Sequence, residues 1–449
     1  MAREIRIHDT RSGEVLPLRP DDDGHVGIYA CGPTVYGPIH IGNARPFVVF
    51  SLLKRFLEHE GLRVTLVINV TDVNDKIYDA ARAAGRPSDE LAREMTARYR
   101  ADTDALGLGR PDHEPLATQT IDGIIALIEA LIERGHAYEA GGDVYFDVRS
   151  DPAYGSLSHR SVDAMDQGEG VEGADRKRDP LDFALWKARK EDEDTWWDSP
   201  WGPGRPAWHI ECSAMGEQYL GVGFQIHGGG TDLVFPHHEN EAAQTRAARG
   251  AELAQIWMHN GMLLMGEEKM AKSVGNIALL GDVVERWGRD AVLVAFASAH
   301  YRQPMRFDDG VMTQATRSVE RIREAARRAG DGPSPELEPL RDRFFDSLAD
   351  DFNTPAAMAA LYEWITRSNA SGGGDAAQLR EMLQVLALEN LLDAAAPEAP
   401  PEVVALAEER VAARAARDFA RADELRDAIA AAGWTVRDGP DGYELTPAA

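Results

Sequence analysis

The chain has 449 residues, of which 44% are hydrophobic and 27% are charged, a composition that excludes a mostly disordered protein. With 48 basic and 75 acidic side chains, its formal net charge is −27, which argues against a protein that coats nucleic acid through general positive charge. Two cysteines cannot form a disulfide framework, so we expect a cytoplasmic protein. The charged N-terminus and the absence of long apolar runs predict neither a signal peptide nor a membrane span.

The first apolar segments predict a parallel β-sheet. Residues 25–30 are typical of a strand, residues 41–59 have apolar side chains at helical spacing, and residues 64–70 predict a second strand. Strand, helix and strand in this order indicate a parallel βαβ unit. A second piece begins at residues 223–226 and runs through glycines into a helix predicted to open at Pro236. Two such pieces predict one nucleotide-binding sheet that is split by an insertion.

The insertion lies between the helical stretch 121–133 and the tryptophan-rich stretch 186–208. Its acidic, glycine-rich segment, residues 163–175, is interpreted as a mobile loop rather than as a folded module. We therefore expect the insertion to be small and loop-like.

The C-terminal half is predicted to be largely helical. A proline-rich break at residues 332–335 precedes a long helical region over residues 337–392. A second break, residues 395–401, precedes two alanine-rich helices and a final segment at residues 434–445. The predicted domains are the first half of the nucleotide-binding domain (1–120), the insertion (121–200), the second half of that domain (201–310), a helical bundle (311–395) and a small C-terminal domain (396–449).

The start of the first long helix has the features of a phosphate site. Unpaired N–H groups and the positive end of the helix dipole at this point suit an anion. His40 and Asn43 are three residues apart and would share a helix face, and Gly42 would let a nucleotide approach the backbone. The alternative is a helix that merely begins with a turn and carries a solvated histidine.

A second polar segment, residues 266–273 with the sequence GEEKMAKS, contains two lysines at a spacing of three. Lys269 and Lys272 would form a cationic clamp for the charge that develops on a departing pyrophosphate. The alternative is an ordinary solvated loop. The pair HIGN and KMAKS together resembles the two motifs of class I aminoacyl-tRNA synthetases, with Ala271 where that family usually has serine.

The cysteines, a histidine and a glutamate are candidates for a metal site. Cys31 ends the first strand, Cys212 lies far along the chain, and His237 and Glu241 are four residues apart on a predicted helix. Two thiolates, one imidazole and one carboxylate fit a tetrahedral Zn²⁺ ion. The alternative is a pair of buried, inert cysteines. The spacing does not decide between His237 and His238.

Further segments resemble cysteinyl-tRNA synthetases over nearly the whole chain, most strongly up to Phe307. The segments that carry this resemblance are residues 29–36, 40–43, 69–76, 182–187, 199–202, 208–215, 227–233, 236–241 and 350–355. The resemblance implies an α/β fold: a split Rossmann-type parallel-sheet catalytic domain with an insertion, a helical bundle and a small α/β anticodon-binding domain. It also implies ATP-dependent activation of L-cysteine to cysteinyl adenylate and transfer to the 3′ end of cysteine tRNA.

The resemblance assigns a role to each candidate residue. A single zinc ion would select the substrate thiol, and Mg²⁺ would accompany ATP in a protein expected to be a monomer. The implied zinc ligands are Cys31, Cys212, His237 and Glu241; the cysteine pocket would contain Thr71, Trp208 and His227; and ATP would contact His40, Gly42, Asn43, Gly229, Asp232, Lys269 and Lys272. The alternatives are purely structural roles: a strand-end cap for Thr71 and a core position for Trp208.

Four arginines near the C-terminus, Arg410, Arg414, Arg417 and Arg421, are spaced to form one basic stripe for RNA if a single helix continues through them. The alternative is a solvated helix face paired with Glu409, Asp418 and Glu424. Residues 437–444 depart from the family pattern, so individual anticodon contacts are not assigned. The rival functions are a mycothiol-pathway ligase that couples cysteine to an amino sugar, and a catalytically silent RNA-binding relative.

Overall fold

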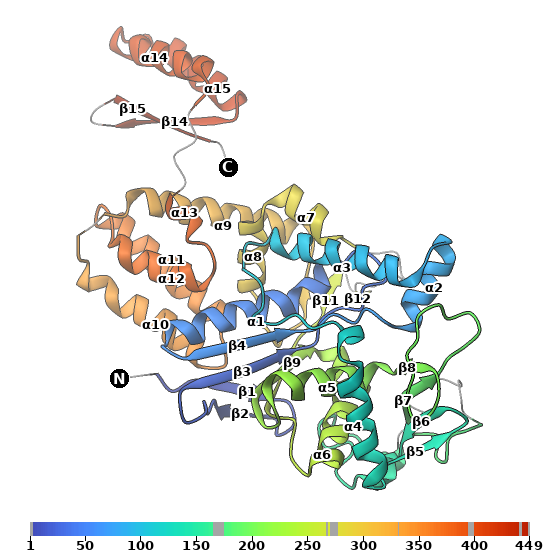
Figure 1. Ribbon diagram of the computed structural model, residues 1–449. Coiled ribbons are helices and arrows are strands. Elements are labelled where there is room, and N and C mark those ends of the chain that lie inside the picture. Colours follow the sequence, from blue (N-terminus) through green and yellow to red (C-terminus); the bar gives the residue numbers. More distant parts are fainter. Residues whose placement is uncertain are drawn as a thin grey trace.

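The computed structural model describes residues 3–164, 175–265, 268–269, 277–330, 332–393, 399–439 and 442–447. Figure 1 shows a large part built around a central sheet, which the sequence predicts to be the catalytic part, a helical region packed beside it, and a small C-terminal module that stands apart. The segment predicted to be a mobile loop, residues 163–175, lies mostly outside the described residues.

The central sheet has four parallel strands in the order β10–β9–β3–β4. The first half of the chain contributes β3 (His25–Ala30), the helix α1 (Ile41–His59) and β4 (Arg63–Ile68). The second half contributes β9 (Phe224–Gly230) and β10 (Ala254–Asn260). The strand order reverses between β3 and β9, and such a switch point places a ligand site beyond the carboxyl ends of the strands. The split parallel sheet expected from the sequence is confirmed.

The apolar periodicity of α1 explains how this helix covers the sheet. Val48, Phe50 and Leu53 are fully buried. Phe50 lies so close to β9 that a Cβ atom on Gly228 would be 2.0 Å from its Cζ atom. Glycine at this position therefore allows helix and sheet to pack together.

The insertion contains a folded antiparallel sheet, so the expectation that the insertion as a whole is loop-like is wrong, whereas the loop predicted for residues 163–175 stays a prediction. The helix α4 (Ile121–Glu133) has the predicted bounds. An antiparallel sheet in the order β5–β6–β7–β8 follows. Its strands are β5 (Ala137–Ala140), β6 (Asp143–Phe146), β7 (Phe183–Ala188) and β8 (Gly204–Pro206). β5 and β6 form a hairpin through Gly141 and Gly142, whereas long connections separate β6 from β7 and β7 from β8, so the hairpin is the only part of the sheet with a local signal in the sequence.

The remaining elements of the catalytic part surround the two sheets. They are β1 (Arg6–Asp9), β2 (Glu14–Pro17), α2 (Asp75–Ala84), α3 (Ser88–Asp104), α5 (Trp208–Leu220), α6 (Glu239–Arg249), β11 (Leu263–Met265), β12 (Glu268–Lys269), α7 (Leu280–Trp287), α8 (Arg289–Ala297) and β13 (Met305–Arg306). The helix predicted to open at Pro236 begins instead at Glu239, because residues 234–238 form an irregular turn with extended backbone at Phe235.

The long helical region predicted for residues 337–392 consists of several helices. These are α10 (Glu338–Ala349), α11 (Thr354–Ala370), α12 (Ala376–Val385) and α13 (Asn390–Asp393), preceded by α9 (Asp309–Arg328). Asp351 and Phe352 have left-handed backbone, with φ of +60° and +46°, which ends α10 and redirects the chain into α11.

The C-terminal module contains the helices α14 (Pro401–Ala415) and α15 (Phe419–Ala431) and the hairpin β14 (Trp434–Gly439) and β15 (Gly442–Pro447). Its small core gathers Val403, Ala407, Ile429, Trp434 and Val436.

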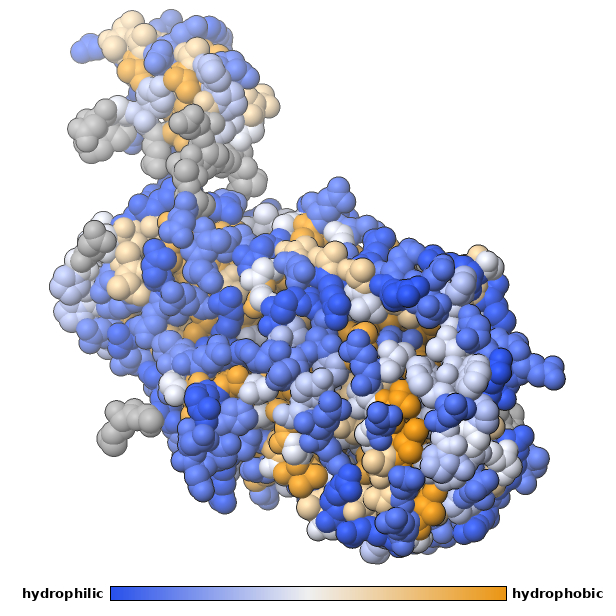
Figure 2. Space-filling view, in the orientation of Figure 1, coloured by the Kyte–Doolittle hydropathy of each residue, from blue (hydrophilic) through white to orange (hydrophobic). Residues whose placement is uncertain are grey.

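Hydrophilic side chains dominate the face of the molecule shown in Figure 2, with scattered apolar patches on the catalytic part. Among the described residues, no helix combines the length and the apolar character needed to cross a bilayer.

Candidate metal and substrate site

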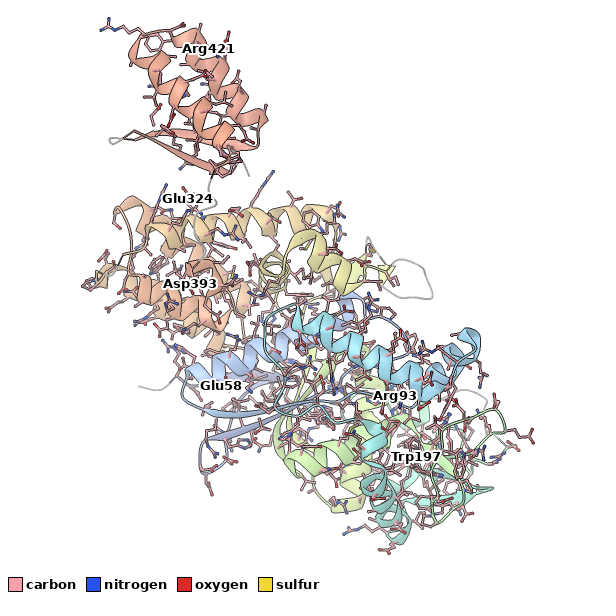
Figure 3. All side chains as sticks on the ribbon, turned by 45° about the horizontal axis from the view of Figure 1, so that its top comes forward. Glu58, Arg93, Trp197, Glu324, Asp393 and Arg421 are labelled. Carbon is pink, nitrogen blue, oxygen red and sulfur yellow. The ribbon has the colours of Figure 1, made fainter. Side chains whose placement is uncertain are left out.

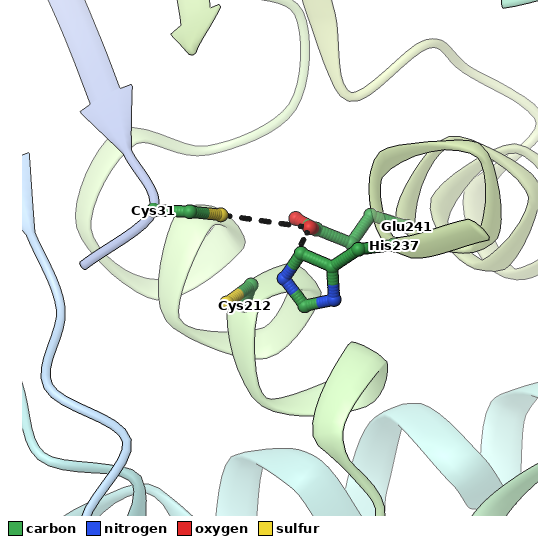
Figure 4. Close-up of side chains that lie close together, drawn as sticks. All are labelled: Cys31, Cys212, His237 and Glu241. Carbon is green, nitrogen blue, oxygen red and sulfur yellow. Dashed lines mark hydrogen bonds and ion pairs between the residues drawn. The ribbon is translucent and has the colours of Figure 1, made fainter. Parts of the chain in front are cut away.

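The four predicted metal ligands lie together beyond the carboxyl ends of β3 and β9 (Figure 4). Cys31 directly follows β3, and Cys212 is in the first half of α5. His237 lies in the turn before α6, and Glu241 is in the first turn of that helix. One ligand atom from each side chain lies within 4.8 Å of the others, and all four residues are buried.

The donor atoms of this group are suited to a cation. The Cys31 Sγ atom is 3.6 Å from Glu241 Oε1, and His237 Nε2 is 3.1 Å from the same oxygen. The latter pair lacks hydrogen-bond geometry, so the buried Nε2 atom has no hydrogen-bond partner within the described part of the chain. Burial raises the pKa values of Cys31 and Cys212 and lowers that of His237. A divalent cation would compensate the ionised thiols and carboxylate and occupy the unpartnered nitrogen, so the group fits a metal ion.

His238 remains an alternative ligand. Its Nε2 atom is 3.3 Å from Cys31 Sγ, and a second possible group contains Cys31, His227, His238 and Glu241. The Nδ1 atom of His238 lies 2.7 Å from Nε2 of His259. His238 is thereby oriented between a cysteine and a second histidine.

The histidines His209 and His259 were not singled out from the sequence. His209 Nδ1 lies 2.7 Å from His237 Nδ1, and His259 Nδ1 lies 2.7 Å from the hydroxyl of Thr10. Both histidines are buried. His259 is near the carboxyl end of β10, the strand beside β9, and this position in a parallel sheet is the signal that could have indicated it.

Two of the three predicted cysteine-pocket residues adjoin the metal group. Trp208 is half-buried and stacks on His237, with ring centroids 4.0 Å apart. The Nε2 atom of His227 is 2.8 Å from Glu241 Oε2. Thr71 is buried, and its hydroxyl donates to Glu211 Oε2 over 3.2 Å. Glu211 directly precedes the metal-ligand candidate Cys212 in the chain. The hydroxyl of Thr71 is therefore held by a carboxyl whose pKa burial raises well above its usual value.

The predicted phosphate residues occupy the start of α1, as expected. His40 caps the helix: its Nδ1 accepts from the Asn43 backbone N–H over 3.3 Å, and Asn43 Oδ1 accepts from the His40 N–H over 3.2 Å. A Cβ atom on Gly42 would lie 2.9 Å from His40 Nδ1, so glycine permits this cap. The backbone of Lys269 forms part of β12, whereas the position of Lys272 lies outside the described residues.

The predicted adenosine residues flank the end of β9. Gly229 is buried, and a Cβ atom there would lie 2.9 Å from Leu233 Cδ1 and 3.1 Å from His238 Cε1. Close packing by these two side chains is therefore one reason for glycine at this position. Asp232 is exposed in the turn that follows the strand.

A cationic cavity of about 580 Å³ adjoins Trp208 and His209. It lies between the start of α2 and the insertion sheet. Its charged lining consists of Arg176, Lys177, Lys187, Arg189, Lys190 and Arg205 against Asp75, Asp143 and Asp175. Asp75 anchors part of this lining: it accepts from Lys187 over 3.0 Å and pairs with Arg205, which also binds Glu193 over 3.0 Å. Positive charge is thus concentrated locally on a chain of net charge −27.

The predicted basic stripe of the C-terminal module is wrong in one respect, because α14 ends at Ala415 and does not continue through the later arginines. Arg410 is buried and binds Asp438 over 2.7 and 3.1 Å, and Arg414 pairs with the same carboxylate over 2.9 Å. Arg421, labelled in Figure 3 on this module, pairs with Glu424 and Glu409 over 3.0 and 3.3 Å. The arginines therefore do not form one unpaired helical face.

Three family models match the chain. Residues 17–317 match the catalytic domain of class I tRNA synthetases (C), residues 343–392 match the DALR domain, and residues 396–444 match the cysteinyl-tRNA ligase anticodon binding domain. Curated cysteine–tRNA ligases of Alkalilimnicola ehrlichii and Halorhodospira halophila are 45% and 44% identical, and each alignment covers 98% of both proteins.

Solved structures share the fold at low identity. Methionyl-tRNA synthetase of Mycobacterium tuberculosis, in complex with methionyl adenylate, aligns with a TM-score of 0.60 and 16% identity over 81% of this chain and 88% of that chain. LeuRS of Agrobacterium radiobacter aligns with a TM-score of 0.60 and 12% identity over 84% of both chains. From the family models and the close curated relatives, we conclude that the chain belongs to the cysteinyl-tRNA synthetase family.

Proposed function

We propose that this protein is a cysteine–tRNA ligase that activates L-cysteine with ATP and transfers it to cysteine tRNA. The observation that carries the proposal is the buried group of two thiols, one imidazole and one carboxylate beside the switch point of the central sheet. This donor set suits a Zn²⁺ ion, and an ion held there would accept a soft donor such as the sulfur of cysteine.

The residues that would hold Zn²⁺ are Cys31, Cys212, His237 and Glu241. His238 would support this site through the contact of its Nε2 atom with Cys31 Sγ. When bound, the ion supplies a position that favours a thiolate over a hydroxyl. A pocket that discriminates by apolar contacts alone separates close analogues by only about 1–3 kcal/mol. Trp208 and His227 would enclose the substrate, and Thr71 would form part of the pocket.

Phosphate binding is assigned to the start of α1 and to the KMAKS segment. The cysteine carboxylate attacks the α-phosphorus of ATP, the bond to the bridging oxygen breaks, and pyrophosphate leaves with its electron pair. Nδ1 of His40 is engaged in the helix cap, so a phosphate contact would come from Nε2. Asn43 would donate a hydrogen bond to a phosphate oxygen, and Lys269 and Lys272 would offset the developing negative charge, with Mg²⁺ accompanying ATP. Gly42, Gly229 and Asp232 are assigned to the nucleotide.

We assign tRNA binding to two surfaces of the protein. The cationic cavity adjoins Trp208, which stacks on the metal ligand His237, so it is suited to the phosphates of an RNA 3′ end entering the site. The C-terminal module, which matches an anticodon-binding domain, is assigned to the distant end of the tRNA. In the second step the terminal ribose hydroxyl attacks the adenylate carbonyl and releases AMP.

Cysteine-dependent ATP–pyrophosphate exchange tests the first step, and charging of transcribed cysteine tRNA tests the second. We expect exchange with cysteine, exchange at least a hundredfold weaker with serine, and charging of the transcript. Absence of exchange would indicate a silent relative. Exchange without charging, but with coupling of cysteine to an amino sugar, would indicate the mycothiol-pathway reaction.

A further inference from the structure

A buried arginine in α1 has no carboxylate partner in the described part of the chain. Arg45 is 1% exposed. Its Nη1 group donates to the carbonyl oxygens of Gly261 and Met262 over 2.5 and 3.2 Å, and Nη2 donates to the carbonyl of His300 over 3.2 Å. Burial lowers the pKa of Arg45 to about 10. Burying a cation among neutral acceptors is unfavourable, so a smaller apolar residue would serve better if only packing mattered.

The carbonyl groups bound by Arg45 lie where the KMAKS segment is anchored. Gly261 and Met262 directly precede β11, which pairs with β12, the strand that contains Lys269. The returning chain passes beside this point, because the N–H of Gly261 donates to the carbonyl of Tyr301 over 2.7 Å. The chain between Gly261 and Leu280, which contains the two KMAKS lysines, is called the lysine segment. Arg45 therefore contacts the beginning of the lysine segment and also the later chain at His300.

The end of the same segment is attached to the HIGN motif through the backbone. The N–H of Ile41 donates to the carbonyl of Ala278 over 2.9 Å, and the N–H of Leu280 donates to the carbonyl of Ile39 over 3.1 Å. The start of α1 thus holds both ends of the lysine segment. One attachment uses only backbone atoms, whereas the other depends on the Arg45 side chain.

We infer that Arg45 is a positioning residue for adenylate formation that holds β11, and through it the backbone of Lys269 in β12, beside the phosphate site at the start of α1. This inference rests on the proposed function. The planar guanidinium reaches three carbonyl groups on two chain segments, which the single ammonium of lysine does not reproduce. Glycine at position 261 lets the segments approach, because a Cβ atom there would be 2.4 Å from the backbone of Gln303.

Arg45→Met and Arg45→Lys in the full-length protein test this inference. The matched control is Arg289→Met, because Arg289 also joins segments through carbonyls: it donates to Leu106 over 2.7 Å and to Ala387 over 2.6 Å, away from the lysine segment. The readouts are kcat of ATP–pyrophosphate exchange, the cysteine dissociation constant from tryptophan fluorescence, and the urea midpoint of unfolding.

We expect Arg45→Met to lower kcat about 100-fold, because small displacements in an aligned site have effects of this size. The cysteine dissociation constant should change less than twofold. The kcat of Arg45→Lys should be about tenfold higher than that of Arg45→Met, and Arg289→Met should lose stability without a comparable loss of kcat. Equal kcat losses in the two methionine variants at equal stability would overturn the inference.

Should Arg45→Met fail to fold, Arg45→Lys decides the question. A kcat equal to that of the unaltered protein would then overturn the positioning role, and a reduced kcat with unchanged cysteine binding would support it. If the unaltered protein itself showed no exchange, the proposed function would fail as well. Exchange in the unaltered protein with full activity in both Arg45 variants would overturn the positioning role alone.

Discussion

The metal group and the C-terminal module use charged side chains in opposite ways. In the metal group, ionisable side chains are buried and surrounded by further histidines. In the module, residues 399–449 contain no histidine, and arginine–carboxylate pairs lie mostly at the surface. There, hydrogen bonds from Arg410 lower the pKa of Asp438. We expect single substitutions to abolish the function of the buried group, whereas contacts in the module should fail gradually.

The strongest test of this contrast is Cys212→Ser. A serine hydroxyl is a poor zinc ligand, so we expect loss of bound zinc and a fall in cysteine-dependent exchange of more than about 1,000-fold. Elemental analysis and exchange kinetics measure the two effects. Ser213→Ala is the neighbouring control: the Ser213 hydroxyl is buried and donates to Gln244, yet it lies outside the metal group. Full zinc content and activity in Cys212→Ser would contradict the assignment.

Removal of residues 400–449 tests whether the C-terminal module contributes to tRNA binding and not to cysteine activation. We expect exchange to stay within about twofold of the full chain, because the metal group and the start of α1 are retained. The kcat/KM for tRNA should fall about 100-fold, because the contacts far from the acceptor end are lost. Parallel exchange and charging assays on one preparation provide the internal control. Normal charging would mean that the module does not bind the tRNA.

Replacement of the two adjacent histidines sharpens the assignment within the metal group. His237→Ala should eliminate zinc binding, whereas His238→Ala should weaken zinc affinity about 10- to 100-fold, the usual effect of removing a group that orients a ligand. Competition with a chelator measures both affinities. The reverse order of effects would make His238 the ligand and His237 the supporting residue.

The smallest effect concerns acid sensitivity near the metal group. Burial lowers the pKa of His259 from 6.5 to about 3. Below pH 6.5 the unfolded chain therefore binds a proton that the folded chain does not bind, and the free energy of unfolding falls as pH falls, by up to about 1.4 kcal/mol per pH unit. His259→Gln should remove this contribution between pH 6.5 and 5.

Urea unfolding at several pH values measures the slope, and His159→Gln, at a surface position, controls for the loss of an imidazole. An unchanged slope in His259→Gln would mean that His259 is already charged in the folded protein. Because residues 399–449 contain no histidine, we expect the loss of stability between pH 6.5 and 5 to arise in the catalytic part and not in the C-terminal module.

Much of the fold could be predicted from local patterns. Residues 25–30, 41–59 and 121–133 have the predicted bounds because their apolar periodicity and their boundaries agree. The insertion sheet was not predicted: the Gly141-Gly142 hairpin between β5 and β6 was overlooked, and β7 and β8 join it only across long connections. The break between α10 and α11 was missed because it depends on left-handed backbone at Asp351 and Phe352, and a bulky residue such as phenylalanine rarely adopts this conformation.

By itself, the sequence determined which chemical groups are available: two thiols, a histidine–glutamate pair at helical spacing, a phosphate-binding helix start and two loop lysines. The tertiary structure alone decided which of them meet. Cys31 and Cys212 converge because β3 and α5 pack at the same end of the sheet, and Arg45 reaches the anchor of the lysine segment only across that packing. Local spacing constrains neighbours in the chain, whereas contacts between distant residues follow from how helices and strands bury their apolar faces.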